Sequence, residues 1–249
     1  MQYTLNETKY GPMAYLKNDY AFVQALNQGR IYEQELVEDI LAPFIRESHT
    51  ILDIGAHAGS HSLIYSALNP TAQIYAYEPQ RALHDLLKFN IAIQKRYNII
   101  PIAAALGNKR CTAYMHATIP DGPNCNMPLN STDMFNFGGR QLGVGGEAVE
   151  IYTLDELWNC HNPPVDFIKI DVEGFENFVV DGGRNLIRHC SPVLFFEHNE
   201  KRPTVHMDGY YNPARSVLEV LTELDYTIKE CAGSNYLAIP NIGRWQNMH

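Results

Sequence analysis

The chain has 249 residues, of which 45% are hydrophobic and 19% are charged, and its formal net charge is −9. This composition is typical of a folded domain with a sizeable core, and no basic stripe favours a nucleic-acid partner. No run approaches the roughly 18 apolar residues of a membrane span, and the five cysteines include no C-x-x-C pair. We therefore expect one soluble, cytoplasmic domain over residues 1–249, with no membrane partner, while its oligomeric state stays open.

The N-terminal part of the chain contains one clear helical pattern. Residues 1–30 are polar and rich in tyrosine without a clear period, so we expect an irregular N-terminal extension that lies on the domain. In residues 32–45 apolar side chains recur at helical spacing. Pro43 is predicted to tighten or end that helix.

The stretch TILDIGAHAGSHS, residues 50–62, organises the rest of the chain. An apolar run interrupted only by Asp53 leads into Gly55 and Gly59, and a helical apolar pattern begins at Leu63. This order predicts a buried strand, a tight turn and a helix, the first unit of a doubly wound α/β sheet. Because the spacing is G-x-x-x-G and Asp53 would repel a pyrophosphate, we expect a nucleoside ligand other than a dinucleotide.

A second strand is predicted at residues 73–77, and it ends at Glu78 and Pro79. Glu78 lies 23 residues after Gly55, close to the spacing of about 20 at which such folds place a ribose-binding carboxylate. In the following helix Asn90 shares the apolar stripe. A buried amide needs partners, so we expect Asn90 to bind the backbone of a loop or of a ligand.

The middle of the chain is the least regular part. Residues 99–105 are predicted as the third strand, and residues 108–148 are rich in Gly, Asn and Pro. An irregular insertion of this length is uncommon and usually functional, so we expect a substrate-facing loop with one hairpin. A short strand at 150–152 is predicted next, and Thr153 and Glu156 have the spacing of a capping box.

Two further strands are predicted at residues 165–170 and 192–196, and ionisable residues follow each of them. These residues are Asp171, Glu173, Glu197 and His198. The remaining predicted elements are an amphipathic helix over 213–224 and a hairpin of strands 226–230 and 236–239.

Carboxylates at the ends of several neighbouring strands cost electrostatic energy unless a cationic ligand or a metal balances them. S-adenosylmethionine suits this arrangement, because it brings an amino group, a sulfonium and a ribose with only one carboxylate. The N–H groups of the glycine turn can receive that carboxylate. Glu78 can hold the ribose, and Asp171 is expected beside the transferring methyl group.

The motifs DIGAHAG, YEP, AALG, TLDEL and VDFIKIDVEGFE resemble the signature series of FkbM-type methyltransferases over about residues 32–198. The resemblance implies a class I methyltransferase fold, which is a Rossmann-like, seven-stranded, mostly parallel sheet with helices on both faces and an antiparallel last strand. It also implies S-adenosylmethionine as cofactor and O-methylation of a hydroxyl on a sugar, glycan or related small molecule. His57 stands where the family commonly has Asn. The cofactor-binding residues expected from the motifs and the residue pattern are Asp53, Gly55, His57, Gly59, Glu78, Pro79, Asn90, Ala104 and Asp171.

Methylation of a hydroxyl needs a general base, whose help is typically worth about 10²–10⁴-fold. The candidates are Asp171, Glu173 and His198, and histidine is the residue type that titrates nearest to neutral pH. Lys169 is expected to neutralise neighbouring acids. We predict a metal-free site, with two alternatives left open. One is a metal-dependent transferase in which Asp171, Glu197 and His198 bind a divalent ion, and the other is a nicotinamide-dependent oxidoreductase on a similar sheet.

Overall fold

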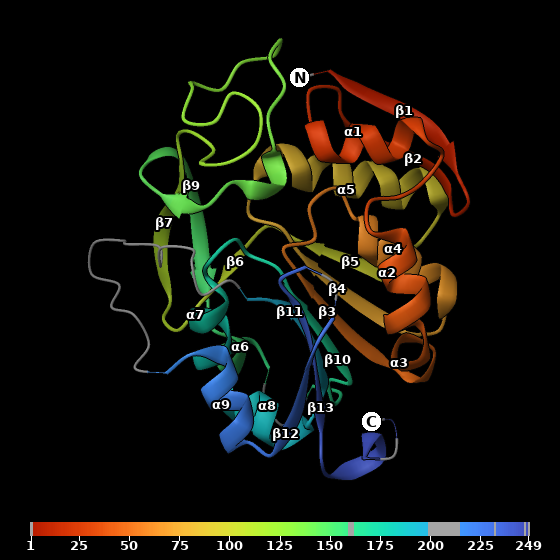
Figure 1. Ribbon diagram of the computed structural model, residues 1–249, viewed down its shortest axis with the longest axis vertical. Helices are drawn as coiled ribbons and strands as arrows, with labels where there is room; N and C mark the ends of the chain where they lie inside the picture. Colours follow the sequence, from red (N-terminus) through yellow and green to blue (C-terminus); the bar gives the residue numbers. More distant parts are fainter. Residues whose placement is uncertain (1, 159–161, 199–214, 232, 247, 249) are drawn as a thin grey trace.

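The computed structural model describes residues 2–158, 162–198, 215–231, 233–246 and 248. A seven-stranded sheet lies at its centre (Figure 1). In spatial order its strands are β12 (Tyr226–Glu230), β13 (Asn235–Pro240), β11 (Val193–Glu197), β10 (Phe167–Ile170), β3 (Thr50–Ile54), β4 (Gln73–Tyr77) and β5 (Ile99–Ile102). The strands from β11 to β5 are parallel, whereas β13 is antiparallel to both β11 and β12. The predicted seven-stranded, mostly parallel α/β sheet is confirmed.

Helices cover both faces of this sheet because successive side chains of the strands point to opposite faces and both faces are apolar. Phe167 belongs to one hydrophobic core, and its neighbour Ile168 belongs to the other. The first core includes α4 (Ser60–Leu68) and α5 (Arg81–Gln94). The second core includes α6 (Leu154–Leu157), α7 (Glu176–Asp181), α8 (Arg184–Cys190) and α9 (Val217–Glu223).

The N-terminal segment is regular, so the prediction of an irregular extension over residues 1–30 was wrong. It forms a hairpin of β1 (Tyr3–Thr8) and β2 (Gly11–Leu16), followed by α1 (Tyr20–Asn27). β1 is exposed or half-buried along its whole length, and its less exposed side chains, Thr4, Asn6 and Thr8, are polar, so no apolar face marks it as a strand. β2 packs on α5, and the side chains from Met13 to Leu16 are buried.

The helix predicted over residues 32–45 exists, but Pro43 neither tightens nor ends it. The helical run comprises α2 (Gln34–Leu36), a π-helical segment (Val37–Leu41) and α3 (Ala42–Glu47). Ala42 donates its N–H to the carbonyl of Val37, five residues back. Pro43 has no N–H to continue the usual ladder, and the helix widens just ahead of it.

A second sheet of four strands stands beside the carboxyl ends of the central sheet (Figure 1). Its spatial order is β6 (Ala105–Leu106), β9 (Gly145–Tyr152), β7 (Cys111–His116) and β8 (Leu142–Gly143). The third predicted strand, 99–105, is therefore divided, because the chain turns at Ala104 and β6 pairs with β9 instead of β4. The insertion at 108–148 is more ordered than expected, since β7, β8 and part of β9 lie within it.

The C-terminal part follows the predictions closely. Thr153 and Glu156 form the predicted capping box, and β12 and β13 form the predicted hairpin. The predicted helix at 213–224 is described as α9, which begins at Val217 after a second capping box at Ser216; residues 213–214 lie outside the described residues. Among the described residues, no helix is both long and apolar enough to cross a membrane.

Candidate functional site

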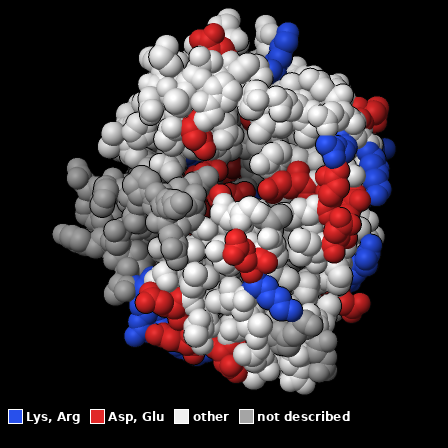
Figure 2. All heavy atoms as spheres, viewed as in Figure 1, with Lys and Arg blue, Asp and Glu red and all other residues white. Residues whose placement is uncertain are grey.

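A cavity of about 330 Å³ opens where β3, β4, β10 and β11 end. Figure 2 shows this face of the molecule hollowed near its middle, with acidic side chains in and beside the hollow. The walls combine the glycine turn, the loop after β10 and residues of the second sheet. The predicted cofactor residues that line the cavity are Gly55, His57, Glu78, Pro79, Ala104 and Asp171.

The glycine turn brings β3 into direct contact with the loop after β10. Gly55 has φ +81°, and a Cβ placed there would lie 1.8 Å from the carbonyl oxygen of Asp171. Only a residue without a side chain allows this approach. Gly59 has φ +92°, and a Cβ there would meet Leu87 at 2.6 Å, so its role is to pack the turn against α5.

Glu78 is buried at the edge of the cavity, with 3% of its surface exposed. Its Oε2 accepts the N–H of His57 at 3.0 Å, and its Oε1 accepts the N–H of Gln80 at 2.8 Å. Burial raises the pKa of Glu78, although the nearby His57 opposes that shift. Each carboxylate oxygen keeps a second lone pair, so the fixed carboxylate can still accept hydrogen bonds from a ligand.

His57 connects the glycine turn to the N-terminal segment. Its ring stacks on Phe22 of α1, with centroids 3.9 Å apart and planes at 6°. Its Nε2 lies 2.9 Å from Oδ2 of Asp19, which is fully buried. Burial raises the pKa of Asp19, and the contact with His57 acts in the opposite direction. The turn is therefore held from the side of α1 as well as from the sheet.

Lys169 lies under the cavity between two carboxylates. Its Nζ donates to the carbonyl of Gly55 at 2.7 Å and lies 3.5 Å from both Asp53 and Asp171. Burial lowers the pKa of Lys169, but Asp171, Asp53 and Glu33 outweigh it and the net shift is upward. The expectation that Lys169 neutralises neighbouring acids is confirmed.

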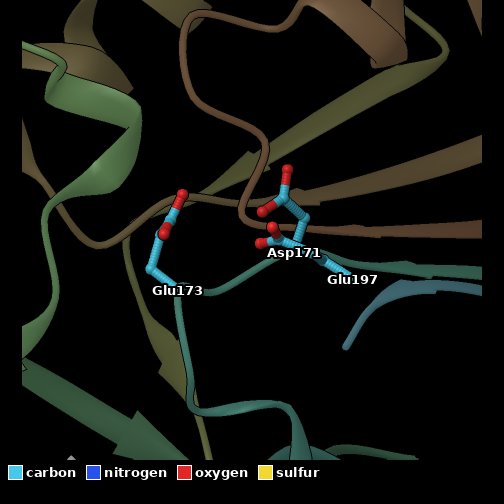
Figure 3. Close-up of side chains that lie close together, drawn as sticks. All are labelled: Asp171, Glu173 and Glu197. Atoms are coloured by element: carbon cyan, nitrogen blue, oxygen red, sulfur yellow. The ribbon is translucent and has the colours of Figure 1, made fainter. Parts of the chain in front are cut away.

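Three carboxylates gather at one end of the cavity. Asp171 and Glu173 come from the loop after β10, and Glu197 comes from the end of β11 (Figure 3). One carboxylate oxygen of each lies within 4.8 Å of the others. Glu173 has φ +57° and is followed by Gly174 with φ +97°, so the loop makes a left-handed turn there. These carboxylates form an acidic group, defined here as Asp171, Glu173 and Glu197.

Glu176 closes the loop that carries Asp171 and Glu173. Its Oε1 accepts the N–H groups of Val172 and Gly174, each at 3.1 Å. Burial raises the pKa of Glu176 to about 7, against these hydrogen bonds, and Asp171 adds to the rise. The shape of the loop therefore depends on a carboxyl group that titrates near neutral pH.

The insertion at 108–148 supplies another part of the wall. Its lining residues are Met115, Asp121, Asn136, Gly138, Arg140 and Leu142. Arg140 is fixed there, because its Nε donates to the carbonyl of His116 at 2.9 Å and its Nη1 to Glu147 at 3.2 Å.

Four predicted site residues do not line the cavity: Asp53, Gly59, Asn90 and His198. Asp53 lies behind the turn, where it accepts the hydroxyl of Ser62 at 2.5 Å. Asn90 bonds to the backbone of Ala14, in β2, and to the carbonyl of Ala58, in the glycine turn, so it binds loop backbone as predicted. His198 lies beyond the end of β11, and its ring centroid is 6.0 Å from that of Tyr236.

Several lining residues were missed at the sequence level. They are Phe22, Tyr32, Glu33, His61 and Arg140. Only His61 lies within a motif, the glycine turn stretch. Phe22 belongs to α1, Tyr32 and Glu33 lie between α1 and α2, and Arg140 belongs to the insertion. No strand end marks these residues, and only packing brings them to the cavity.

The chain combines a mostly parallel α/β sheet, a glycine turn after β3 and a cavity at the carboxyl ends of the strands. This combination is typical of Rossmann-like proteins, which bind nucleoside ligands at that edge of the sheet. The model of the methyltransferase FkbM domain family matches residues 53–230, more than half of the chain. The chain therefore belongs to the FkbM methyltransferase family, as the motif series had predicted. No curated protein matches the sequence.

Solved structures of methyltransferases resemble the chain at low identity. An FkbM methyltransferase from Methylobacillus flagellatus is 16% identical with a TM-score of 0.48, over 77% of this chain and 43% of that one. The chain thus spans less than half of that protein. A putative caffeoyl-CoA O-methyltransferase from Staphylococcus aureus is 12% identical with a TM-score of 0.47, over 86% and 87% of the two chains. A SAM-dependent methyltransferase from Aquifex aeolicus is 14% identical with a TM-score of 0.44, over 88% and 98%.

Proposed function

We propose that the chain is an S-adenosylmethionine-dependent methyltransferase that acts on a hydroxyl group of a sugar, glycan or related small molecule. The proposal rests on the positions of the carboxylates on the two sides of the glycine turn. A buried carboxylate, Glu78, stands at one side of the glycine turn, and the acidic group of Asp171, Glu173 and Glu197 stands at the other. A ligand that joins a ribose to a positively charged centre matches both.

The residues of the cavity fit this cofactor. Glu78 is fixed by two backbone N–H groups and keeps lone pairs for two ribose hydroxyls. Apolar residues such as Ala104, Leu106 and Met115 supply a surface for the adenine ring of the cofactor. When bound, S-adenosylmethionine supplies an activated methyl group on a positively charged sulfur, and the nearby carboxylates favour that charge.

The acidic group also supplies the candidates for the general base. Asp171 and Glu173 line the cavity, as does Glu197, so each of them can reach an acceptor hydroxyl and take its proton. His198, the third base considered from the sequence, does not line it. We therefore favour a carboxylate base.

The proposal is tested in two steps. Calorimetry should detect binding of S-adenosylhomocysteine to the purified protein. From a panel of sugars, glycans and amines, at least one sugar or glycan should then receive the methyl group of a labelled donor. Asp171→Asn is expected to reduce turnover by about 10²-fold or more. If no adenosyl ligand binds, the assignment of the cofactor is wrong. If the label goes only to amines, the cofactor stands and the hydroxyl acceptor does not.

A second candidate is a metal-dependent transferase, because three carboxylate oxygens within 4.8 Å of one another form a set that a hard divalent cation prefers. The group differs from the set considered from the sequence, since Glu173 takes the place of His198. A bound cation would acidify the acceptor hydroxyl. Activity that disappears with a chelator and returns with magnesium or manganese would favour this candidate over the metal-free base that we prefer.

A further inference from the structure

Glu33 is a carboxylate of the cavity that no motif marks. It precedes α2, at the start of the helical run before β3, and it lines the cavity. Its side chain interacts with Asn235, the residue that pairs with Glu197 across β11 and β13. Glu33 therefore lies on the same side of the cavity as the acidic group and on the opposite side of the glycine turn from Glu78.

The backbone and a histidine hold Glu33 in place. Its φ is +56°, a left-handed conformation that is uncommon for a residue with a side chain and that clusters at functional sites. Its Oε2 lies 3.2 Å from Nε2 of His61, in the first turn of α4 directly after the glycine turn. The His61 side chain is 4% exposed, whereas the Glu33 side chain is 25% exposed, so the carboxylate is the more accessible partner.

The charge state of Glu33 decides between two roles, a general base and a group that binds a cation. Burial would raise the pKa of Glu33, but the hydrogen bond and the charge of His61, together with Lys169, lower it. A carboxylate that stays ionised is a weak base for a hydroxyl and a good partner for a cation. Lys169 does not occupy it as a close ion pair, since its Nζ is shared between Gly55, Asp53 and Asp171.

The amino-acid part of the proposed cofactor supplies such a cation. The N–H groups of Gly55, Ala56, His57 and Gly59 already donate within the fold. The first turn of α4, whose N–H groups have no partner in the preceding turn of helix, can receive the carboxylate of the cofactor. The carbonyl of Gly55 keeps one lone pair, but it already accepts from the cationic Nζ of Lys169 at 2.7 Å, and that charge disfavours a second cation at the same oxygen. The carboxylate of Glu33 is held by His61 against the first turn of α4, where it can accept from the amino group.

We propose that Glu33 binds the α-amino group of the S-adenosyl cofactor and that His61 positions the Glu33 carboxylate. The inference rests on the proposed function, because it assigns one more contact to the same cofactor. It also gives the N-terminal half of the chain a part in cofactor binding.

The test measures how the protein distinguishes two ligands that differ only in this amino group. Calorimetry compares S-adenosylhomocysteine with its analogue that lacks the α-amino group, on the wild type and on Glu33→Gln. The wild type should prefer S-adenosylhomocysteine by about 10- to 100-fold, the usual size of a charged hydrogen bond. In Glu33→Gln that preference should fall to within about twofold, while the analogue binds both proteins equally.

Glu35→Gln is the matched control, because Glu35 is two residues away, exposed, and paired with Arg30 outside the cavity. It should keep the full preference. His61→Gln keeps an N–H donor and should retain most of it, whereas His61→Leu should lose it.

The other outcomes separate the two proposals. If no adenosyl ligand binds the wild type, the proposed function fails. If S-adenosylhomocysteine binds and Glu33→Gln weakens both ligands equally, Glu33 only supports the fold and the inference is wrong. It is equally wrong if the preference persists in Glu33→Gln while turnover collapses, since Glu33 would then be the base.

Discussion

At the residue scale, the side chains that matter most are buried carboxylates whose partners are backbone N–H groups. Glu78 is the clearest case, since both its oxygens are fixed before any ligand arrives. A preformed acceptor loses little conformational freedom on binding, so a larger share of each hydrogen bond contributes to affinity.

Glu78→Gln is expected to weaken binding of S-adenosylhomocysteine by about 1–3 kcal/mol, because charged hydrogen bonds to the ribose become neutral ones. Calorimetry measures the change, and circular dichroism checks that the fold is intact. Unlike Glu33→Gln, this variant should weaken 5′-methylthioadenosine as well, since that ligand keeps the ribose and lacks the amino acid. Unchanged affinity for both ligands would remove Glu78 from the site.

Lys169→Met is expected to reduce the free energy of unfolding by about 3–5 kcal/mol, because it leaves the fully buried Asp53 without its cation. Urea denaturation provides the measurement. Lys88→Met serves as the control, since Lys88 is 51% exposed and its pairing with Asp85 contributes little. A loss no larger than that of the control would show that the buried pair is not needed.

At the element scale, the loop from β10 to α7 combines backbone geometry with a titrating group. Glu176 holds the loop through Val172 and Gly174. Its pKa is about 7 in the folded chain against an ordinary value of 4.5. Folding therefore favours the protonated form, so this group favours the folded state most below about pH 4.5, and that contribution is lost as the pH rises to 7.

Glu176→Gln should consequently flatten the dependence of stability on pH between about 4.5 and 7. Across that interval the contribution of Glu176 to the free energy of unfolding of the wild type is expected to fall by on the order of 3 kcal/mol, since each pKa unit is worth about 1.4 kcal/mol. The amide keeps an oxygen for the two N–H groups, so the loop can persist. Thermal unfolding across this pH range measures the effect, and parallel curves for the two proteins would show that Glu176 is not the group involved.

At the scale of the whole molecule, the cavity is shared by the central sheet, the N-terminal segment and the insertion. Phe22, Gly55 and Arg140 line it from these three parts. A ligand that contacts all three binds the folded chain and not the unfolded one, so it stabilises the whole molecule.

S-adenosylhomocysteine at about 100 times its Kd is therefore expected to add about 2.7 kcal/mol to the stability. For a chain of this size that corresponds to a rise in Tm of about 5–10 °C. NAD at the same concentration should leave Tm unchanged, because Asp53 and the G-x-x-x-G spacing disfavour a pyrophosphate. A shift with NAD alone would support the oxidoreductase alternative.

Local patterns in the sequence determined the central sheet. Buried strands of a parallel sheet are short apolar runs, and the turn at Gly55, the capping box at Thr153 and the hairpin of β12 and β13 each depend on residues close together in the chain. Strand ends of such a sheet meet at one edge, so the positions of Glu78 and Asp171 beside one cavity also followed from the sequence.

Tertiary structure alone decided the rest. The hairpin of β1 and β2 is stabilised by packing on α5 that its own sequence does not signal, and Asn90 proved to bond to the backbone of Ala14, 76 residues away. Glu33 reaches the cavity from the residue before α2 and contacts His61 of α4 there. Glu197, the last residue of β11, lines the cavity, whereas His198, beyond the end of that strand, does not. Contacts between segments distant in the chain have no local period, and they appear only once the chain is packed.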